Sequence, residues 1–468
     1  MRQPKLKSAI LIWLSVILWS GSLGLAQSAN SSDLILEPGD PPDSEVDPVV
    51  IADQNIDVSD ATSPRQAHLT YHFDFTNQGP GDVTHLDVYV AIPPSRKNQK
   101  ISNLVFSSPY TLLTDRYGQQ IAYFQFETIA SGEHVTVSWE GDVEIAAKDY
   151  GVDPSKVGGF DLIPSDIIST YTTAESMYRL DSQIIQDAAK TAANGATNPY
   201  WIARNIHDFV ANRLTYLNDH VWDDAETVYL QQHGSCSEYT TLFIALCRAN
   251  GLPARYVGGT RQREEGTYVD TVYHRWAEVY LPPYGWIPID VNHDDTNSGV
   301  RYTYFGAITD ERFVTTVGGG NSEYLGWNYH DSYRYYYSGS LPSTDRERSF
   351  TWEPYVAPNI AVAPTSITKY VLSNTSDSLI GNLDITSTDG SAMSWEEASS
   401  PGWLYLNKSS GTTPDSGQVW VDTSGLSTGR YRGEIVFQSQ PSGSNVSVTV
   451  NLLLVDELFE LYLPIIKK

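Results

Sequence analysis

The sequence predicts a multidomain protein in which an α+β domain lies between two β-sandwiches. Apolar and polar residues alternate in several segments between residues 65 and 150, which is typical of half-buried strands. Helical periodicity is confined to about residues 180–250, and a run of strand-like segments follows it. From about residue 357 the helical pattern is gone, and short strands alternate with turns rich in Gly, Ser and Pro.

Length and charge limit the classes of function. A chain of 468 residues fits about three domains. The formal net charge of −26 argues against a nucleic acid partner, because few cations are available to neutralise phosphates. Such a charge suits a well-solvated, exported protein. The 30 tyrosines and 12 tryptophans fit strand-rich domains, and also fit contacts with sugars or peptides without distinguishing them.

Residues 1–26 have the pattern of a signal peptide. Three basic residues lie among the first seven, residues 9–19 (AILIWLSVILW) are apolar, and residues 24–26 (GLA) offer a small-residue cleavage site. The apolar run is short for a membrane span, and no later segment has about 18 uninterrupted apolar residues. We expect a secreted protein, extracellular or at the cell surface, that does not span a membrane after cleavage. An uncleaved anchor is the alternative.

Five regions follow the signal peptide. Residues 27–64 are acidic and contain proline (EPGDPPDSEVDP), which predicts a flexible linker. The N-terminal β-sandwich domain is expected at 65–155, an α+β domain at 160–345 and the second β-sandwich at 357–455. The remaining residues, 456–468, contain the apolar FELYLPIIKK and are interpreted as a C-terminal tail, either a frayed final strand or a docking segment.

Both cysteines lie in one predicted helix within the sequence HGSCSEYTTLFIALCRANGLP. Ser235 followed three residues later by Glu238 is a capping box, and apolar residues then repeat at helical spacing until Gly251. Eleven residues at about 1.5 Å each separate Cys236 from Cys247 by roughly 16 Å. A disulfide needs Cα atoms within about 7 Å, so we predict that the two cysteines do not pair.

The two thiols have different expected roles. Cys247 lies beside the apolar stripe and is interpreted as a buried small hydrophobic residue. Cys236 lies at the first helical position, where free backbone N–H groups and the helix dipole lower the pKa of a thiol. A free cysteine in an exported protein needs a reason, and a nucleophile is one. Inert packing is the alternative interpretation of Cys236.

A cysteine nucleophile needs a base and a group that orients the base. His233 precedes the helix cap and His293 lies in an acidic loop, whereas His274 lies on a predicted strand (YHRWAEVYL) that holds it more firmly. Asp290 ends the next strand, WIPID. A three-residue hairpin loop at 282–284 would place Asp290 on the same face as His274, and a two-residue loop would place it on the other face. The sequence leaves this register open.

Residues 233–290 resemble the core of transglutaminase-like proteins. The resemblance rests on GSC at a helix start, on GLPARYVGG, on HRWAEV and on the tryptophan-to-aspartate spacing of WIPID, and covers roughly residues 180–315. It implies a papain-like α+β fold and an acyl-thioester mechanism, with Cys236, His274 and Asp290 as the catalytic triad. Residues 65–150 resemble the β domain that often precedes this core. Tyr216 is a candidate second donor to the oxyanion, beside the backbone N–H of Cys236.

Residues 360–455 resemble a BACON-type β-sandwich, through the sequence PGWLYLNKSSGTTPDSGQVWVDTSGLSTGRYRGEIVFQS. That resemblance implies a carbohydrate or cell-surface ligand for the C-terminal domain. The expected substrate of the catalytic domain is a protein or a peptide.

Three functions are compatible with these patterns. The first is protein glutamine acyl transfer by a secreted, transglutaminase-like thiol acyltransferase. The second is a hydrolase, a cysteine peptidase or amidase, which uses the same triad with water as acceptor. The third is a non-catalytic surface binding or scaffold protein. No cofactor is expected, although DVNHDDTN at 290–297 spaces its carboxylates like a calcium loop; a solvated acidic loop is the alternative.

Overall fold

The structure, a computed structural model, describes residues 64–218, 221–296, 301–373, 375, 377–440 and 444–457, and also the backbone of Leu34–Leu36. The predicted signal peptide and most of the predicted C-terminal tail lie outside these residues. Among the described residues, no helix combines the length and the apolar character that a membrane crossing requires.

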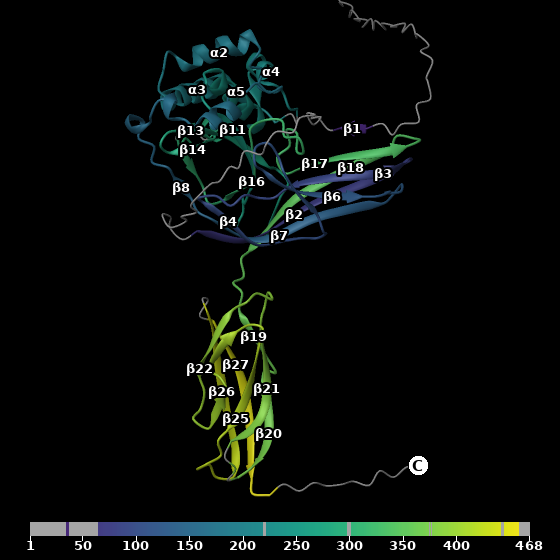
Figure 1. The fold of residues 1–468 in the computed structure, drawn as a ribbon, viewed down its shortest axis with the longest axis vertical. Coiled ribbons are helices and arrows are strands. Elements are labelled where there is room, and N and C mark those ends of the chain that lie inside the picture. The colour runs from purple at the N-terminus through teal and green to yellow at the C-terminus, as the bar shows by residue number, and fades with distance from the viewer. Residues whose placement is uncertain are drawn as a thin grey trace, which may run out of the picture.

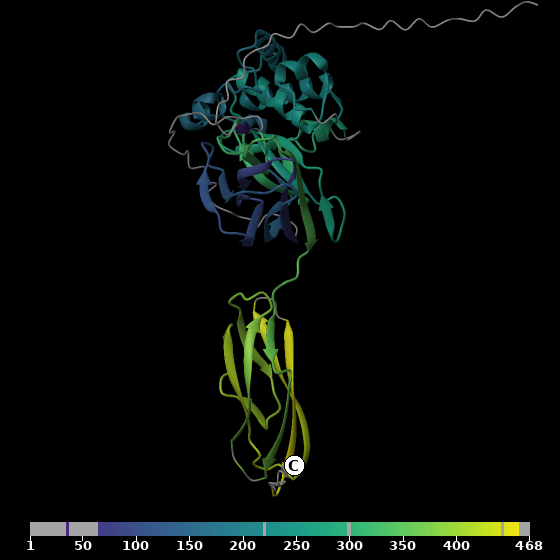
Figure 2. The same ribbon diagram turned by 90° about the vertical axis from the view of Figure 1, so that its right-hand side faces the viewer.

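The first β-sandwich consists of two five-stranded sheets that enclose an apolar core (Figures 1 and 2). One sheet has the strand order β1-β17-β3-β6-β5, and the other has the order β12-β18-β2-β7-β4. Their bounds are β1 (Leu34–Leu36), β2 (Arg65–Gly79), β3 (Asp82–Ala91), β4 (Gln99–Phe106), β5 (Thr111–Thr114), β6 (Gln120–Phe126), β7 (His134–Ile145), β12 (Tyr268–Asp270), β17 (Asp331–Ser338) and β18 (Ser343–Pro354). Strand β2 alternates buried and partly exposed residues along most of its length, as its sequence pattern predicts.

The predicted boundaries of the first two domains need correction. Strand β17 pairs with β3, and β18 pairs with β2 from Ser343 opposite Gly79 to Pro354 opposite Ala67. Residues 331–354 therefore complete the N-terminal sandwich, although the sequence placed residues up to 345 in the catalytic domain and closed the sandwich at 155. Pairing between strands more than 240 residues apart leaves no local trace in the sequence, which explains the error.

The predicted linker also contains a strand. The apolar triplet Leu34–Leu36 forms β1, which pairs with β17 opposite Tyr336, Tyr335 and Arg334. Acidic, proline-bearing sequence surrounds this triplet, and it obscured the short strand.

The α+β domain packs helices against a four-stranded antiparallel sheet of order β14-β13-β11-β16. The helices are α1 (Ser165–Tyr171), α2 (Gln183–Ala193), α3 (Pro199–Arg213), α4 (Ala225–Gln231), α5 (Cys236–Ala249) and α6 (Val291–Thr296). The strands are β11 (Ala254–Arg261), β13 (His274–Leu281), β14 (Gly285–Ile289) and β16 (Arg312–Gly318), with the two-residue strands β8 (Lys148–Asp149), β9 (Thr215–Tyr216), β10 (His233–Gly234) and β15 (Ala307–Ile308).

Helix α5 forms the centre of this domain. All of its residues from Ser237 to Arg248 are buried, and it packs against α2, α3, β11 and β13. The helix starts upstream follow the sequence: Ser182 caps α2, and Asn198 caps α3 with Pro199 at the first helical position. A helix buried on all sides is held firmly, so its first residue is a precise place for a functional side chain.

The sandwich and the α+β domain are joined by buried polar contacts. The side chain of Gln99 on β4 donates to the carbonyl of Val314 and accepts from its N–H. Arg96 and Arg255 both pair with Glu278 of β13, and all three side chains are buried. Since Arg96 belongs to the sandwich and Glu278 to the α+β domain, this cluster fixes one against the other.

The second sandwich begins at Ile360, and Figures 1 and 2 show a single extended loop connecting it to the rest of the chain. Its sheets have the orders β19-β21-β25-β23 and β20-β27-β26-β22-β24. The strands are β19 (Ile360–Ala363), β20 (Ser366–Leu372), β21 (Ser378–Ser387), β22 (Ser394–Ser399), β23 (Leu404–Leu406), β24 (Ser410–Thr412), β25 (Asp415–Val421), β26 (Gly429–Gln440) and β27 (Asn445–Val455). Its core includes Trp395, Phe437 and Leu383.

Candidate active site

Cys236 is the first residue of α5, and the capping box predicted before it is present. The carboxylate of Glu238 accepts a hydrogen bond from the backbone N–H of Ser235 (2.7 Å), and the Ser235 hydroxyl accepts from Ser237 (3.4 Å). Cys236 is partly buried, Cys247 is fully buried, and both are free thiols, as predicted. The capped helix therefore places the Cys236 side chain at the positive end of the α5 dipole, which favours a thiolate.

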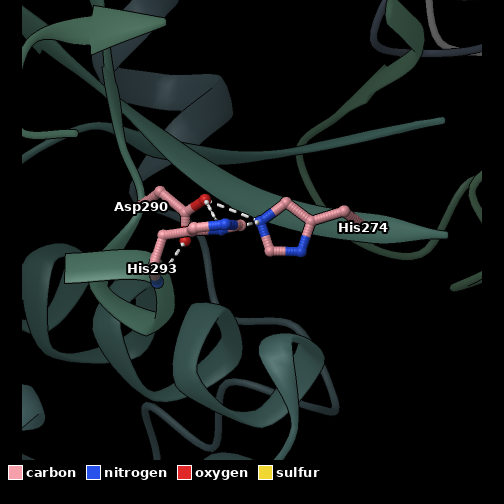
Figure 3. Close-up of side chains that lie close together, drawn as sticks. All are labelled: His274, Asp290 and His293. Carbon is pink, nitrogen blue, oxygen red and sulfur yellow. Dashed lines mark hydrogen bonds and ion pairs between the residues drawn. The ribbon is translucent and has the colours of Figure 1, made fainter. Parts of the chain in front are cut away.

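His274 and Asp290 meet because the hairpin has the three-residue loop. Leu281 pairs with Gly285 and Ala277 with Ile289, so the next residue, Asp290, lies on the face that carries His274. The Nε2 atom of His274 lies 2.6 Å from Oδ2 of Asp290 (Figure 3). Both side chains are buried. The register that the sequence left open is thus the one that permits the triad.

The side chain of His274 and the backbone N–H of Arg275 lie close enough to the Cys236 thiol to stabilise its thiolate form. Since Nε2 faces Asp290, the Nδ1 atom is the ring nitrogen left for the thiol. Burial raises the pKa of Cys236, but the hydrogen bond and charge of His274 and the nearby Arg275 outweigh burial, and the net pKa is lowered. This arrangement favours a thiolate paired with an imidazolium.

Asp290 is the most heavily contacted carboxylate of the site. Its Oδ2 lies 2.7 Å from Nη1 of Arg312 and 3.2 Å from Nδ1 of His293, and its Oδ1 accepts from the backbone N–H of His293. Burial opposes its ionisation, yet His274 and Arg312 hold the pKa of Asp290 well below its usual range. In turn, burial lowers the pKa of His274, but the Asp290 charge prevails and raises it to about 9.

The acidic segment after Asp290 is a helix and not a solvated loop. Residues Val291–Thr296 form α6, and Asp294 is buried, accepting from the backbone N–H of Tyr304 and contacting His207 at 3.0 Å. Asp295 accepts a hydrogen bond from Tyr239 (2.6 Å). The prediction of a solvated loop is therefore wrong. The segment is almost entirely polar, so it shows no helical spacing of apolar residues. Buried hydrogen bonds hold this helix instead.

His293 comes from α6 and lies beside both Asp290 and His274 (Figure 3). Its Nδ1 is 3.3 Å from Nε2 of His274, and its Nε2 is 3.0 Å from Nη1 of Arg261. Burial, together with the positive charge of Arg312, keeps the pKa of His293 below its ordinary value. A neutral His293 can donate one hydrogen bond from Nδ1 to the Asp290 carboxylate while adding no positive charge.

Nitrogen and oxygen atoms of His274, Asp290 and His293 all lie within 4.8 Å of one another, a spacing that suits a metal ion. Arg312 weakens that interpretation, because its guanidinium already lies 2.7 Å from Asp290 and would repel a cation. Asp290 is also the first carboxylate of the calcium-loop pattern, and Arg312 occupies it. The other two carboxylates have protein partners as well: Asp294 contacts His207 and a backbone N–H, and Asp295 accepts from Tyr239.

Cys236 opens into a cavity of about 940 Å³ between the α+β domain and the first sandwich. The aromatic and aliphatic side chains around it are Tyr216, Val221, Trp222, Val269, Val272, Tyr273 and Tyr329. Residues 346–349 of β18 and Asp74 of β2 form the sandwich side of the cavity. The volume suffices for several residues of a peptide.

A family model for the transglutaminase-like superfamily matches residues 186–291. This match spans Cys236, His274 and Asp290, the three residues that the geometry brings together. Residues 186–291 form a transglutaminase-like domain. The multidomain arrangement of β-sandwich, α+β core and β-sandwich is the fold class that the sequence predicts.

Other proteins share parts of this chain. An uncharacterised protein of Haemophilus influenzae is 22% identical over 244 residues, covering 45% of this chain and 64% of the relative. The chain thus spans less than two thirds of that relative's length. A candidate cysteine protease from Cytophaga hutchinsonii is 15% identical with a TM-score of 0.42, covering 62% of this chain and 98% of that one. Red sea bream transglutaminase is 11% identical with a TM-score of 0.26, covering 81% of this chain and 78% of that one.

Sequence reasoning found three side chains of the transglutaminase-like site and missed others. Tyr216, the suggested oxyanion donor, lines the same cavity as Cys236. Arg312 was missed because it lies on β16, and only the pairing of β16 with β11 brings it to Asp290. That pairing joins segments about 50 residues apart and leaves no local pattern. His293 was dismissed as a loop residue, although its position three residues after Asp290 would have placed the two together on a helix start.

Proposed function

We propose that this protein is an exported thiol enzyme that transfers acyl groups from amides through a thioester on Cys236, with protein glutamine side chains as acyl donors. The observation that carries the proposal is the continuous chain of contacts from Cys236 to His274 and on to Asp290. The lowered pKa of the thiol and the raised pKa of the imidazole both favour the thiolate–imidazolium pair that the mechanism needs.

Acylation begins when the Cys236 thiolate attacks the amide carbonyl and forms a carbon–sulfur bond. The N–H of Cys236 lies at the start of α5 and can bind the oxyanion, with the Tyr216 hydroxyl as the proposed second donor. Burial and the nearby Cys236 charge raise the pKa of Tyr216, so its hydroxyl keeps its proton. The carbon–nitrogen bond then breaks, and the imidazolium of His274 gives its proton to the departing ammonia.

Deacylation uses the same residues in reverse. His274, now neutral, takes a proton from an incoming amine, which attacks the thioester carbonyl and releases the Cys236 sulfur. Asp290 holds the ring of His274 in one orientation throughout and stabilises its positive charge. With water in place of the amine, the same steps give a cysteine peptidase or amidase, and the open cavity admits either acceptor.

A direct test measures both outcomes with one substrate. The purified protein is incubated with a glutamine-containing peptide, with and without a primary amine, and products are separated by mass spectrometry. The proposal expects an amine adduct that is lost in Cys236→Ala and in His274→Ala. Release of the free acid alone, at the same rate with and without amine, would assign the hydrolytic alternative. If neither product appears and Cys236 is unreactive, a binding or scaffold role takes the place of catalysis.

Two further proposals concern the rest of the chain. The N-terminal segment directs export, and the mature protein acts outside the cell or at its surface. The second sandwich brings the enzyme to a carbohydrate or another cell-surface ligand. Glycan-array binding of the whole protein, compared with a form that ends at Pro354, tests the latter: loss of glycan binding with retained thiol reactivity is the expected result.

The proposed reaction uses no metal or cofactor. Calcium is the only ion that the sequence brought into consideration, and the carboxylates concerned are engaged by protein donors. Adding calcium or a chelator is expected to leave the rate of acyl transfer unchanged within about twofold.

A further inference from the structure

One edge of the first sandwich runs directly into the active-site cavity. In the order β12-β18-β2-β7-β4, strand β18 pairs with β2 along its whole length, but with β12 only from Phe350 to Trp352. Among the described residues, no strand pairs with the other side of residues 343–349. Four of these residues, 346–349, line the same cavity as Cys236.

The chain itself shows why this edge is open. Strand β12 ends at Asp270, whose buried carboxylate accepts hydrogen bonds from the N–H of Val272 (3.0 Å) and of Arg261 (3.0 Å). These bonds turn the chain away from β18 and lead it into β13, which begins at His274. The path that β12 would have taken along β18 is therefore left to another strand, and it opens onto the cavity that Cys236 lines.

Backbone direction identifies the groups that face this open side. The N–H of Arg346 donates to the carboxylate of Asp345 (2.9 Å). That bond places the Arg346 N–H on the side away from β2. Because alternate residues of a strand point to the same side, Thr344 and Arg348 share that direction, and so do Phe350 and Trp352, which face β12. An unpaired strand edge of this kind is a template for another strand.

We propose that the substrate is an extended polypeptide segment that adds to the open edge of β18 as a strand, in line with β12, and so delivers an amide carbonyl to Cys236. This inference rests on the proposed function and adds the class of substrate: an unfolded or flexible segment with at least about five residues in extended form. Residues 343–349 offer roughly 23 Å of edge at about 3.3 Å per residue.

Side chains around the edge indicate which segments fit. Val269 and Val272 are more than half exposed, and Tyr216 and Trp222 are also exposed, although all four are apolar or aromatic and line the cavity. Exposed apolar groups around a catalytic cavity are typical of a binding surface. The substrate segment is therefore apolar on the side that faces the α+β domain.

The experiment compares small and peptide reagents for the same thiol. Iodoacetamide needs no binding edge. Peptides of one, three, five and seven residues carry a chloromethyl ketone, in place of either the glutamine side-chain amide or the C-terminal carboxylate; the thiolate displaces chloride and forms a thioether. Of the two placements of the chloromethyl ketone, the one that reacts faster is used. Its rate of reaction with Cys236 is expected to rise at least about tenfold from the one-residue peptide to the five-residue peptide. Methylation of alternate backbone nitrogens should lower it by about three- to tenfold each.

Hydrogen exchange then locates the bound peptide. Backbone amides in residues 343–349 should exchange more slowly in the five-residue adduct than in the iodoacetamide adduct. Two valines with the same exposed fraction, 58%, give a matched pair of variants: Val272 lies at the cavity, and Val105 lies on β4 at the opposite edge of the same sheet. Val272→Asp should slow the peptide reagent by a larger factor than it slows iodoacetamide, whereas Val105→Asp should slow neither.

The outcomes separate this inference from the proposed function. If iodoacetamide reacts with Cys236 in a His274-dependent way, but peptide length and backbone methylation change the rate less than twofold, strand addition is overturned and the thiol mechanism stands. Equal exchange of residues 343–349 in both adducts also overturns it. If Cys236 in the folded protein reacts no faster than a free thiol, and His274→Ala changes nothing, the proposed function itself fails.

Discussion

Arg312 places its guanidinium 2.7 Å from the Asp290 oxygen that also contacts His274. The carboxylate therefore lies between two cations when His274 is protonated. Arg312 and Asp290 are both buried, so water contributes little to stabilising either charge. This pairing keeps Asp290 ionised and fixes the position from which it orients the histidine.

Replacing Arg312 by Gln is expected to lower the free energy of unfolding by about 3 kcal/mol, because it leaves a buried carboxylate with one cation fewer. It should also slow alkylation of Cys236 at pH 6, because Asp290 is no longer held in place beside His274. Urea denaturation and intact-mass spectrometry measure the two effects. Arg312→Lys keeps the charge and should lose less; equal stability of Arg312→Gln and wild type would contradict the role of the pair.

Thiol reactivity should persist at acidic pH. The lowered pKa of Cys236 predicts rapid reaction with iodoacetamide at pH 6, where an ordinary thiol with a pKa near 8.5 is less than about 1% ionised. In His274→Ala the rate at pH 6 is expected to fall by about 10- to 100-fold, and to recover as pH rises toward 9. Identical rate–pH curves for the two proteins would show that His274 does not activate the thiol.

Turnover should have an alkaline limit near pH 9. The pKa of His274 is raised to about 9, so the imidazolium that protonates the leaving group is present below that pH and is lost above it. We expect kcat/KM to rise as the thiolate forms at low pH and to fall through about pH 9. A rate that stays constant to pH 10.5 would assign the proton donor to another group.

Asp290→Asn should preserve the fold around the site and impair catalysis. An amide cannot stabilise the imidazolium, and it can favour the wrong ring tautomer, so kcat is expected to fall by about 100- to 10,000-fold. Circular dichroism and the melting temperature serve as controls for folding. Activity within a few-fold of wild type would remove Asp290 from the mechanism.

Glu278→Gln should destabilise the junction between the first sandwich and the α+β domain. Arg96 and Arg255 would be left buried without their shared carboxylate, at a cost of about 3–5 kcal/mol in unfolding free energy. Glu353→Gln, an exposed position on β18, is the matched control and should change stability by less than about 0.5 kcal/mol. Denaturant titration followed by tryptophan fluorescence reports both. Similar values for the two variants would show that the cluster contributes little.

The sequence by itself determined the local features of this protein. The capping box placed Cys236 at the start of α5, helix length kept Cys247 away from it, and alternation placed His274 on a strand. These features depend on contacts within a few residues, which the sequence records directly. The cysteine helix, the strand of His274 and the order of a β domain, an α+β core and a second β domain were accessible in this way, whereas Asp290 was assigned through the family resemblance.

Only the tertiary structure decided the hairpin register, the pairing of Asp290 with Arg312 and the sandwich side of the cavity. Arg312 and the strand β18 reach the site through pairings with β11 and β2, and such pairings depend on which apolar faces pack together. Many strands of similar pattern compete for each position in a sheet, and packing of the whole core selects one. For that reason the chemistry of the thiol could be predicted from local sequence, whereas the surface that receives its substrate could not.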